Sequence, residues 1–304
     1  MIKLLNIISI IILPFLISGV IKKTKAFWAG RRGVSILQPF WDVLKLMKKE
    51  VVYSETVSFI FKLTPILLLS SVIFASLFIP ILNGEAIINI PFGFVVFSYV
   101  LGFGKFFSLI GAMDTGSCFE GMGASREACF STIVEPAFFI GMGSIVALTQ
   151  VSGFENLKMI LENAGIYGFV IIALSVVMIF IMLLTECCRV PVDDPTTHLE
   201  LTMIHEVMIL DNSGADLGFI TWASYIKMFL YQALIAALII PAGLELWQSI
   251  LAFLGIIFIT SVIIGTLESS MARFRMSHVF EFIFIMTITS LLILTLVSYR
   301  MYGN

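Results

Sequence analysis

Charged residues are scarce in this chain of 304 residues: they make up 12% of it, whereas hydrophobic residues make up 59%. A soluble globular protein usually carries about 25% charged residues. So little charge excludes an ordinary soluble domain and predicts an integral membrane protein. The formal net charge of −2 gives no reason to expect a nucleic-acid partner.

Cysteine is also rare. The four cysteines are Cys118, Cys129, Cys187 and Cys188, and no two of them form a CxxC pair. Adjacent cysteines such as Cys187 and Cys188 are poorly placed to bind one metal ion together. We therefore expect no metal site and no cofactor in this chain. If the protein works in redox chemistry, the metal centres belong to its partners.

Alternation of polar and apolar residues with period two is absent, which excludes a membrane β-barrel and leaves helices as the spanning elements. Eight uncharged runs are each close to the length needed to cross about 30 Å of hydrocarbon. They are Leu4–Ile21, Leu63–Gly84, Ala86–Gly104, Pro136–Phe154, Asn163–Thr185, Met228–Leu244, Leu246–Leu267 and Phe282–Tyr299. The predicted fold is an all-α integral membrane protein, with residues 1–304 forming a single transmembrane domain.

Basic residues are distributed unevenly between the two sides that these spans define. One side carries Lys22, Lys23, Lys25, Arg31, Arg32, Lys45, Lys48, Lys49, Arg126, Arg189, Arg273 and Arg275, and the other has little beyond Lys3, Lys158 and Arg300. The basic side is expected to face the cytoplasm. This predicts a multi-pass protein of the cell inner (cytoplasmic) membrane, with both termini on the non-cytoplasmic side and segments 22–60 and 186–219 on the cytoplasmic side.

Residues 35–50 predict a helix of a different kind. Apolar residues recur at helical spacing on one face (Ile36, Phe40, Leu44, Met47), and polar residues form the other (Gln38, Asp42, Lys45, Lys49). This pattern is typical of an amphipathic helix in the membrane interface. It has a role beyond that of a surface helix only if a soluble partner docks above it or a lipid-like substrate enters beneath it.

Residues 186–206 hold the densest group of charges, between two strongly apolar runs. The group consists of Glu186, Asp193, Asp194, Glu200 and Glu206, with Arg189, His198 and His205. One charge at the centre of a bilayer helix costs at least ~2.5–3.5 kcal/mol. Charges kept at a membrane boundary are therefore a candidate ion or proton path. The alternative is a solvated loop that only separates two helices.

Two details of this stretch bear on its chemistry. Asp194–Pro195 predicts a helix start, with the aspartate as N-cap and the proline at the first helical position. His198 and His205 lie seven residues apart, which is not the HExxH spacing that places zinc ligands on adjacent turns. Proton exchange and simple polar capping both stay open for these histidines.

Charges also lie near the ends of other spans. Gly111–Glu127 is rich in glycine and serine and predicts a tight loop. Glu135 lies in the span that follows and is either a protonatable relay or part of a buried ion pair. Lys105, near the cytoplasmic end of the third span, could pair with Glu135 or with one of the acids on 111–127 (Asp114, Glu120 and Glu127). At the end of the seventh span, Glu268 could neutralise Arg273.

Together, these motifs resemble one known family. They read GRRGVSILQPFWDVLKLMKKE at 30–50, MDTGSCFEGMGASRE with VEP at 113–136, TECCRVPVDD with HLEL at 185–201, and LESSMARFR at 267–275. The chain resembles the membrane subunit shared by respiratory complex I, as its subunit 1, and by energy-converting nickel–iron hydrogenases of the formate hydrogenlyase type, as their subunit 4. The forms DTGS…GASRE and E-x-S-MAR-x-R resemble the hydrogenase branch.

The resemblance implies site residues by position. The implied ion path consists of Glu135, Glu186, Arg189, Asp193 and Glu200, with Asp194 and His198 as titratable neighbours. The segments expected to hold a soluble partner include Arg31, Arg32, Gln38, Asp42, Asp114, Arg126, Glu268 and Arg273. The family usually reads P-F-D-x-x-E-x-E-x-E-L across 191–201, and this chain has Thr196 and His198 in place of two of those glutamates.

The function that the resemblance implies is that of a non-catalytic membrane-arm subunit. It would anchor a soluble hydrogenase-type electron-transfer module and couple its redox chemistry to proton or sodium translocation. Its implied partners are hydrogenase-like large and small subunits with nickel–iron and iron–sulfur centres, an iron–sulfur protein, and antiporter-like membrane subunits. The alternatives are a quinone-binding subunit of a complex I-like NADH dehydrogenase, a free-standing ion transporter and a purely structural anchor.

Overall fold

The computed structural model describes residues 2–82, 86–150, 153–154, 157, 160, 166–194, 203–241 and 243–302. Within these ranges every regular element is a helix, as predicted. The helices are α1 (Ile2–Trp28), α2 (Gln38–Met47), α3 (Phe59–Ser76), α4 (Gly93–Asp114), α5 (Cys118–Thr149), α7 (Ile166–Glu186), α8 (His205–Met208), α9 (Gly214–Ile239), α10 (Leu246–Ser270) and α11 (Met276–Tyr302). Eight of them are long and apolar enough to cross a membrane, which confirms the predicted multi-pass protein.

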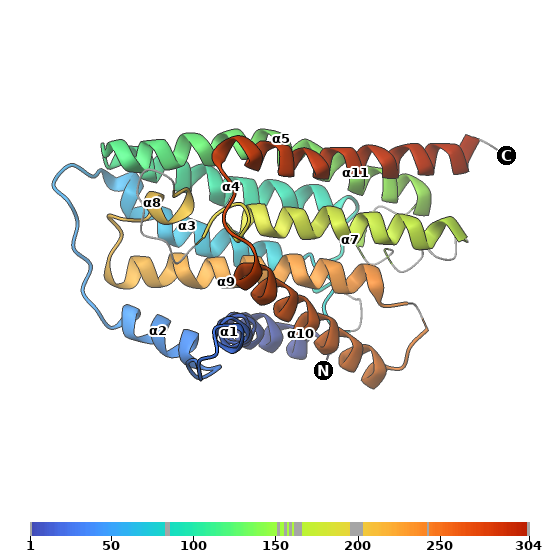
Figure 1. Cartoon of the computed structure of the whole chain (residues 1–304), viewed down its shortest axis with the longest axis horizontal. Helices are drawn as coiled ribbons and strands as arrows, with labels where there is room; N and C mark the ends of the chain where they lie inside the picture. Colours follow the sequence, from blue (N-terminus) through green and yellow to red (C-terminus); the bar gives the residue numbers. More distant parts are fainter. Residues whose placement is uncertain are drawn as a thin grey trace.

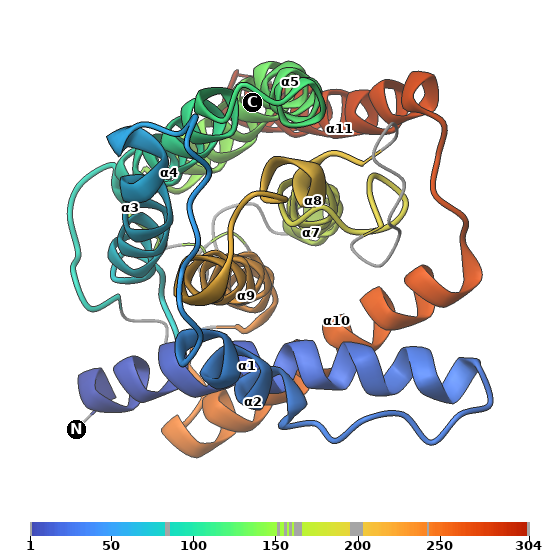
Figure 2. The same cartoon turned by 90° about the vertical axis from the view of Figure 1, so that its left-hand side faces the viewer.

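Most of the long helices run along one axis, and two do not. Figure 1 shows α3, α4, α5, α7, α9 and α11 roughly side by side, whereas α1 is seen almost end-on and α10 crosses obliquely. In the view along the bundle, α7 and α9 lie inside the ring that the other helices form (Figure 2). Charged residues on α7 and α9 are therefore placed in the interior of the protein.

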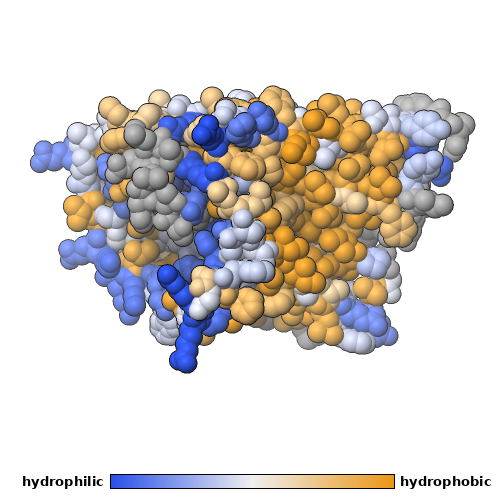
Figure 3. Space-filling model, in the orientation of Figure 1, coloured by the Kyte–Doolittle hydropathy of each residue, from blue (hydrophilic) through white to orange (hydrophobic). Residues whose placement is uncertain are grey.

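The surface divides into an apolar belt and a polar end. In Figure 3 hydrophobic side chains cover much of one half of the molecule, and hydrophilic side chains gather at the end where α2 and α8 lie in Figure 1. An apolar belt is what contact with lipid requires, because hydrocarbon cannot hydrogen-bond polar side chains. The polar end lies outside this belt, where water can hydrogen-bond its side chains.

Small residues bring α3 and α4 into close contact. A Cβ atom on Gly104 would overlap the Oγ of Ser71, and one on Gly111 would overlap the Oγ1 of Thr64. Small residues at such crossings let membrane helices approach closely without a hydrophobic driving force. The position of α4 is thus set by its contact with α3.

The amphipathic helix is confirmed as α2. Its residue Val43 is buried against Phe15 of α1 and Tyr225 of α9, whereas Phe40 and Trp41 stay exposed. A proline in its first turn suits a helix start, because that position needs no backbone donor. One face of α2 therefore packs on the bundle, and the other is left open.

An extended segment, residues 51–58, links α2 to α3 across the polar end (Figure 1). The backbone N–H of Val52 donates to Ser213 Oγ (2.9 Å), just before α9. The hydroxyl of Tyr53 donates to Asp216 Oδ2 (2.8 Å), and burial and this carboxylate both raise the pKa of Tyr53. At the other end, the N–H of Ser58 donates to Asp114 Oδ2 (2.7 Å), so the segment ties the start of α9 to the end of α4.

Two sequence predictions were wrong at this end of the bundle. Gly111–Glu127 is not a loop, because α4 continues to Asp114 and α5 begins at Cys118. Gly123 lies inside α5 and gives α8 room to approach, since a Cβ there would overlap Val207. The third and sixth spans also extend beyond the predicted boundaries, because Lys105 and Lys227 lie inside helices and not at their ends.

Candidate functional site

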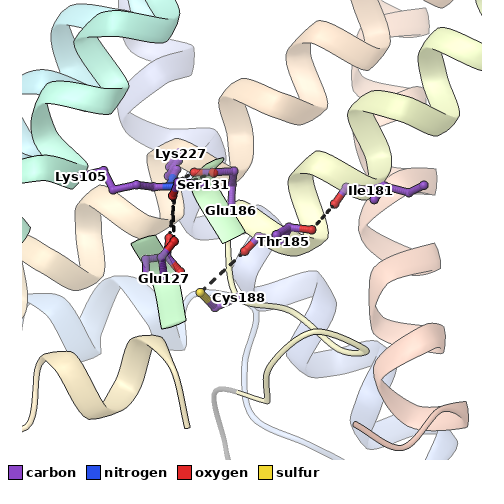
Figure 4. A network of polar contacts seen from close by, with 8 residues as sticks. All are labelled: Lys105, Glu127, Ser131, Ile181, Thr185, Glu186, Cys188 and Lys227. Atoms are coloured by element: carbon purple, nitrogen blue, oxygen red, sulfur yellow. Dashed lines mark hydrogen bonds and ion pairs between the residues drawn. The ribbon is translucent and has the colours of Figure 1, made fainter. Parts of the chain in front are cut away.

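Four helices each contribute one charged side chain to a group inside the bundle, here called the central cluster: Lys105 (α4), Glu127 (α5), Glu186 (α7) and Lys227 (α9). The ammonium of Lys105 contacts Glu186 Oε1 and lies 3.2 Å from Glu127 Oε1. The ammonium of Lys227 lies 2.7 Å from Glu186 Oε2. Figure 4 shows Lys105 and Lys227 converging on Glu186. Two cations and two anions neutralise each other, which a bilayer interior requires.

The central cluster is enclosed. None of its four side chains is more than 16% exposed. The hydroxyl of Ser131, one turn after Glu127, accepts a hydrogen bond of 2.8 Å from Lys105 and donates to the Glu127 carbonyl. Because Glu186 bridges both lysines, a change in its charge would leave two ammonium groups competing for Glu127. Glu186 is therefore the carboxylate that links the two lysines.

A second group of charges, the end cluster, lies towards the polar end. It consists of Lys25 (α1), Arg189, Asp193, Glu268 (α10) and Arg273. Glu268 has a fully buried side chain and pairs with Lys25 (2.9 Å) and Arg189 (3.1 Å). Burial alone would lower the pKa of the Arg189 guanidinium, but the Glu268 carboxylate outweighs it and raises that pKa. The expected Glu268–Arg273 pair is wrong, because Arg273 pairs with Asp193 at 3.3 Å.

Asp193 organises the chain around it. Its Oδ2 accepts the N–H groups of Ile204 (3.0 Å) and His205 (3.2 Å), and its Oδ1 accepts the N–H of Asp194 (2.9 Å). With the Arg273 pair, both carboxylate oxygens are occupied. These contacts fix the start of the short helix α8, since first-turn N–H groups need such an acceptor. Asp193 is thus held by donors that do not exchange protons.

A cavity of about 340 Å³ lies against both clusters. Charged side chains of the central and end clusters line it, together with apolar residues of α3, α4 and α9. The lining includes Lys25, Leu68, Val72, Leu101, Lys105, Glu127, Glu186, Arg189, Asp193, His205, Ile220, Tyr225, Lys227 and Glu268. A cavity of this size, with charged side chains set into a mostly apolar lining, has room for several water molecules. Water there would connect the two clusters by hydrogen bonds.

The cysteines beside the cavity do not suit metal binding. Burial raises the pKa of the Cys187 thiol to about 12 and raises that of Cys188 well above its ordinary value, so both stay protonated at neutral pH. Metal ions bind the thiolate and not the thiol. Within the described ranges, no three His, Cys, Asp or Glu side chains gather as a metal site would require.

The predicted ion-path residues fall into three groups. Glu186 belongs to the central cluster, and Arg189 and Asp193 belong to the end cluster, with Asp194 beside them. Glu135 stands apart on α5: its Oε1 lies about 4 Å from where a Cβ of Gly102 would be. Glu135 is only half-buried. Glu200 and His198 lie outside the described residues, as does the predicted helix start at Pro195.

The predicted docking residues divide into exposed and enclosed. Arg31 and Arg32 are exposed, and Gln38 donates to Asp42 Oδ1 (2.8 Å) on the open side of α2. Asp114 and Arg126 are half-exposed at the polar end and hold the backbone of Ser58 and Met203. Glu268 and Arg273 sit inside the end cluster, so their geometry does not suit contact with a partner.

Sequence reasoning missed Lys227 and Lys25 as members of the two clusters. Local composition makes Lys227 the boundary of the predicted span Met228–Leu244, because this charge directly precedes the uncharged run. The signal that identifies it is the run before it: Phe219–Ile226 carries no charge and continues the same helical pattern. A lysine inside a helix of this kind needs a buried partner, and Glu186 supplies it.

Comparison with known proteins confirms the resemblance read from the motifs. Formate hydrogenlyase subunit 4 of Escherichia coli K12 is 26% identical over 278 residues, which cover 86% of each chain. Hydrogenase-4 component C of the same organism is 27% identical over 243 residues, covering 78% of this chain and 74% of the relative. NADH-ubiquinone oxidoreductase chain 1 of Petunia hybrida is 26% identical over 253 residues, covering 79% and 75%.

A solved structure shares the fold, and a family model matches nearly the whole chain. The structure belongs to the membrane-bound sulfane sulfur reductase, described as an archaeal respiratory membrane complex. It aligns with a TM-score of 0.81 and 19% identity over 97% of this chain and 98% of the other. The family model described as NADH dehydrogenase matches residues 2–299. The chain is therefore a member of the NADH dehydrogenase family, whose relatives here are subunits of hydrogenase-type and complex I-like complexes.

Proposed function

We propose that this chain is the membrane-arm subunit of a hydrogenase-type complex. In this role it anchors a soluble electron-transfer module and couples its redox chemistry to proton or sodium translocation. The observation that carries the proposal is the central cluster, a balanced group of charges from four helices that lines the cavity. A structural anchor has no need of such a group, because buried ion pairs contribute little net stability compared with apolar packing.

The proposed coupling is electrostatic. An electron that reaches a docked partner adds negative charge near the end cluster, where Arg189 and Lys25 already share one carboxylate. Two unit charges 10 Å apart interact by roughly 1.7 kcal/mol at an effective dielectric constant of about 20. That is enough to change proton occupancy in the cavity by more than tenfold. Glu186 responds by exchanging between Lys105 and Lys227, and Glu135 carries charge out of the central cluster.

The proposed partners occupy the polar end and the membrane beside it. Hydrogenase-like large and small subunits and an iron–sulfur protein bind over α2, the 51–58 segment and the start of α5, where Gln38, Asp42, Asp114 and Arg126 lie. Nickel–iron and iron–sulfur centres belong to those subunits. Antiporter-like membrane subunits pack against the apolar belt. We place this end in the cytoplasm and both termini on the opposite side of the cell inner membrane, on the asymmetry of basic residues.

The first experiment identifies the partners. The chain is tagged, extracted in mild detergent, and whatever accompanies it is identified by mass spectrometry. Recovery of a large subunit with the paired cysteines that hold nickel and iron supports the proposal. Recovery of the folded chain alone would contradict the proposal and support the alternative of a free-standing ion transporter.

The second experiment tests coupling in that purified complex, reconstituted into liposomes. Glu186→Gln should lower proton or sodium uptake per hydrogen turned over at least about tenfold, because it removes the charge that both lysines share. Glu281→Gln is the matched control: this carboxylate is exposed on α11 and pairs with His278. Equal uptake ratios for the wild type and Glu186→Gln, with the complex intact, would contradict coupling and support the alternative of a purely structural anchor.

The cavity favours one second candidate, a quinone-binding subunit of a complex I-like dehydrogenase. Apolar residues of α3 and α4 line one side of the cavity, including Leu68, Val72 and Leu101, so an aromatic ring has a place there. The same pull-down separates the candidates, because flavin-containing and quinone-reactive partners would then accompany the chain. Val72→Trp, which fills the apolar side, should abolish quinone reduction in that case.

A further inference from the structure

The turn between α1 and α2 has a defined backbone geometry and carries two exposed arginines, Arg31 and Arg32. The N–H of Arg31 donates to the Ala26 carbonyl (2.8 Å), and the N–H of Gly30 donates to the Phe27 carbonyl (3.0 Å). With Gly30 at φ 65°, these bonds form a Schellman motif that ends α1. The motif fixes where the chain leaves the helix, so Arg31 follows it in a defined position.

A lysine closes the same turn from the other side. The ammonium of Lys23 donates to the Arg32 carbonyl at 2.7 Å. Gly33, at φ 66°, passes so close to α1 that a Cβ would lie 2.5 Å from that of Ala26. The two arginines are therefore carried on a turn that is held to the helix at both ends, and less backbone entropy is lost when they bind an anion.

The charges of this turn differ from those of the neighbouring lysines. Lys22 pairs with Asp42 (3.6 Å) and Lys25 with Glu268 (2.9 Å). Arg31 and Arg32 are exposed, and no carboxylate within the described ranges comes within ion-pair distance of either. Two adjacent guanidinium groups suit a phosphate, because each presents a planar fork of donors that matches its oxygens.

Aromatic side chains mark the level of this turn in the membrane. Phe27 is 76% exposed and Trp28 is 61% exposed, directly before the turn. Amphipathic aromatic rings at the end of a membrane helix are enriched at the headgroup level. In Figure 2 the end of α1 and the chain after it run along the outer edge of the molecule. In Figure 3 that place adjoins the apolar belt.

We infer that the turn at residues 23–33, with Arg31 and Arg32 as its donors and Trp28 beside them, binds the headgroup phosphate of an anionic phospholipid. The position of the turn at the edge of the molecule favours a lipid, because the proposed soluble partner binds at the centre of the polar end. This assigns the two arginines to the membrane instead of to the docking surface. The inference holds whichever ion the protein moves and whichever module it anchors.

The test measures lipid selectivity of the purified complex. The complex is equilibrated with vesicles of equal parts phosphatidylglycerol and phosphatidylcholine, and retained lipids are counted by native mass spectrometry. One basic side chain beside an anionic lipid surface contributes roughly fivefold in affinity. Arg31→Gln with Arg32→Gln should therefore lower the phosphatidylglycerol-to-phosphatidylcholine ratio by roughly tenfold or more at low salt.

Two further variants keep the test interpretable. Lys48→Gln with Lys49→Gln removes two exposed charges at the far end of α2. Because these lysines lie outside the proposed lipid site, the lipid ratio should stay within about twofold of that of the wild type. Arg31→Lys with Arg32→Lys keeps the charge and should retain most of the lipid selectivity. If the glutamine variant lost selectivity only because the turn was unstable without the arginines, the lysine variant would lose it as well.

Three results would overturn the inference. The first is an unchanged lipid ratio in the glutamine variant. The second is an unchanged ratio together with loss of the soluble subunits, which would return both arginines to partner docking. The third is full displacement of phosphatidylglycerol by millimolar inorganic phosphate, which would make the turn a site for the free anion.

Discussion

The central cluster and the end cluster are made of the same kinds of side chain, but their contacts differ. In the central cluster every carboxylate oxygen that forms an ion pair does so with a lysine, whose ammonium can donate and release a proton. In the end cluster Asp193 meets three backbone N–H groups and an arginine, none of which releases a proton. Charge alone therefore does not identify an ion path. The partners of a charge decide whether it can move or only holds the chain.

The largest effect is expected from breaking the central cluster. Glu186→Gln leaves two lysines in the interior with one carboxylate, and removing one partner of a buried ion pair costs about 3–5 kcal/mol. Adding Lys227→Gln restores one cation to one anion, so the double variant should recover about half of the lost stability. Thermal unfolding of the purified complex measures both. If the losses of stability caused by Glu186→Gln and by Lys227→Gln alone simply add in the double variant, Lys227 is not an energetic partner of Glu186.

A smaller and different effect is expected from the end cluster. Asp193→Ala removes the carboxylate that pairs with Arg273 and accepts the first N–H groups of α8, at a cost of about 2–3 kcal/mol. Hydrogen exchange at residues 203–208 should rise. Ion uptake per hydrogen turned over should stay unchanged, unlike in Glu186→Gln. A fall in that ratio with normal exchange would make Asp193 a proton carrier, the role that sequence analysis predicted for it.

Glu135 tests whether a carboxylate outside both clusters belongs to the path. Glu135→Gln should change the free energy of unfolding by less than about 1 kcal/mol, because its half-buried carboxylate accepts no ion pair from the described residues. Ion uptake should nevertheless fall severalfold. Thr132→Val, an exposed position one turn earlier on α5, serves as the control. Normal uptake in Glu135→Gln would confine the path to the central cluster.

The smallest perturbation is thiol labelling, which leaves charge and packing unaltered. Cys118 and Cys129 are exposed on α5, whereas Cys187 is half-buried, Cys188 is buried, and both line the cavity. Because burial raises the pKa of Cys187 to about 12, maleimide at pH 7 should modify Cys118 and Cys129 alone until the protein is denatured. A modified Cys187 in the native complex would mean that the cavity opens to solvent more widely than its lining indicates.

Sequence reasoning reached the fold because membrane helices follow from local composition. The eight spans, an amphipathic helix within residues 35–50 and the pairing of Lys105 with a nearby acid could all be read from apolar runs and the charges that interrupt them. The failures share one cause. Whether Lys227 ends a helix or lies inside it depends on a carboxylate 41 residues away, which no local pattern contains.

Glycine misled the sequence reasoning for a related reason. In Gly111–Glu127 it predicted a loop, because glycine is a poor helix former in water. In the folded protein Gly111 and Gly123 lie in helices and admit Thr64 and Val207 from neighbouring elements. Close packing between helices outweighs the local preference. A contact of this kind is visible only once the neighbour is placed.

The close approach of α3 and α4 has a consequence for how the sequence of this protein can drift. Gly104 carries no charge and touches no ion, but it precedes Lys105, and any larger residue there would push α4 away from Ser71. The helix would carry the ammonium with it, away from Glu127 and Glu186. Selection on the ion pair therefore reaches an apolar neighbour, and relatives with alanine at this position should also have lost the lysine. A relative that keeps lysine beside alanine would show that α4 can shift without losing the pair.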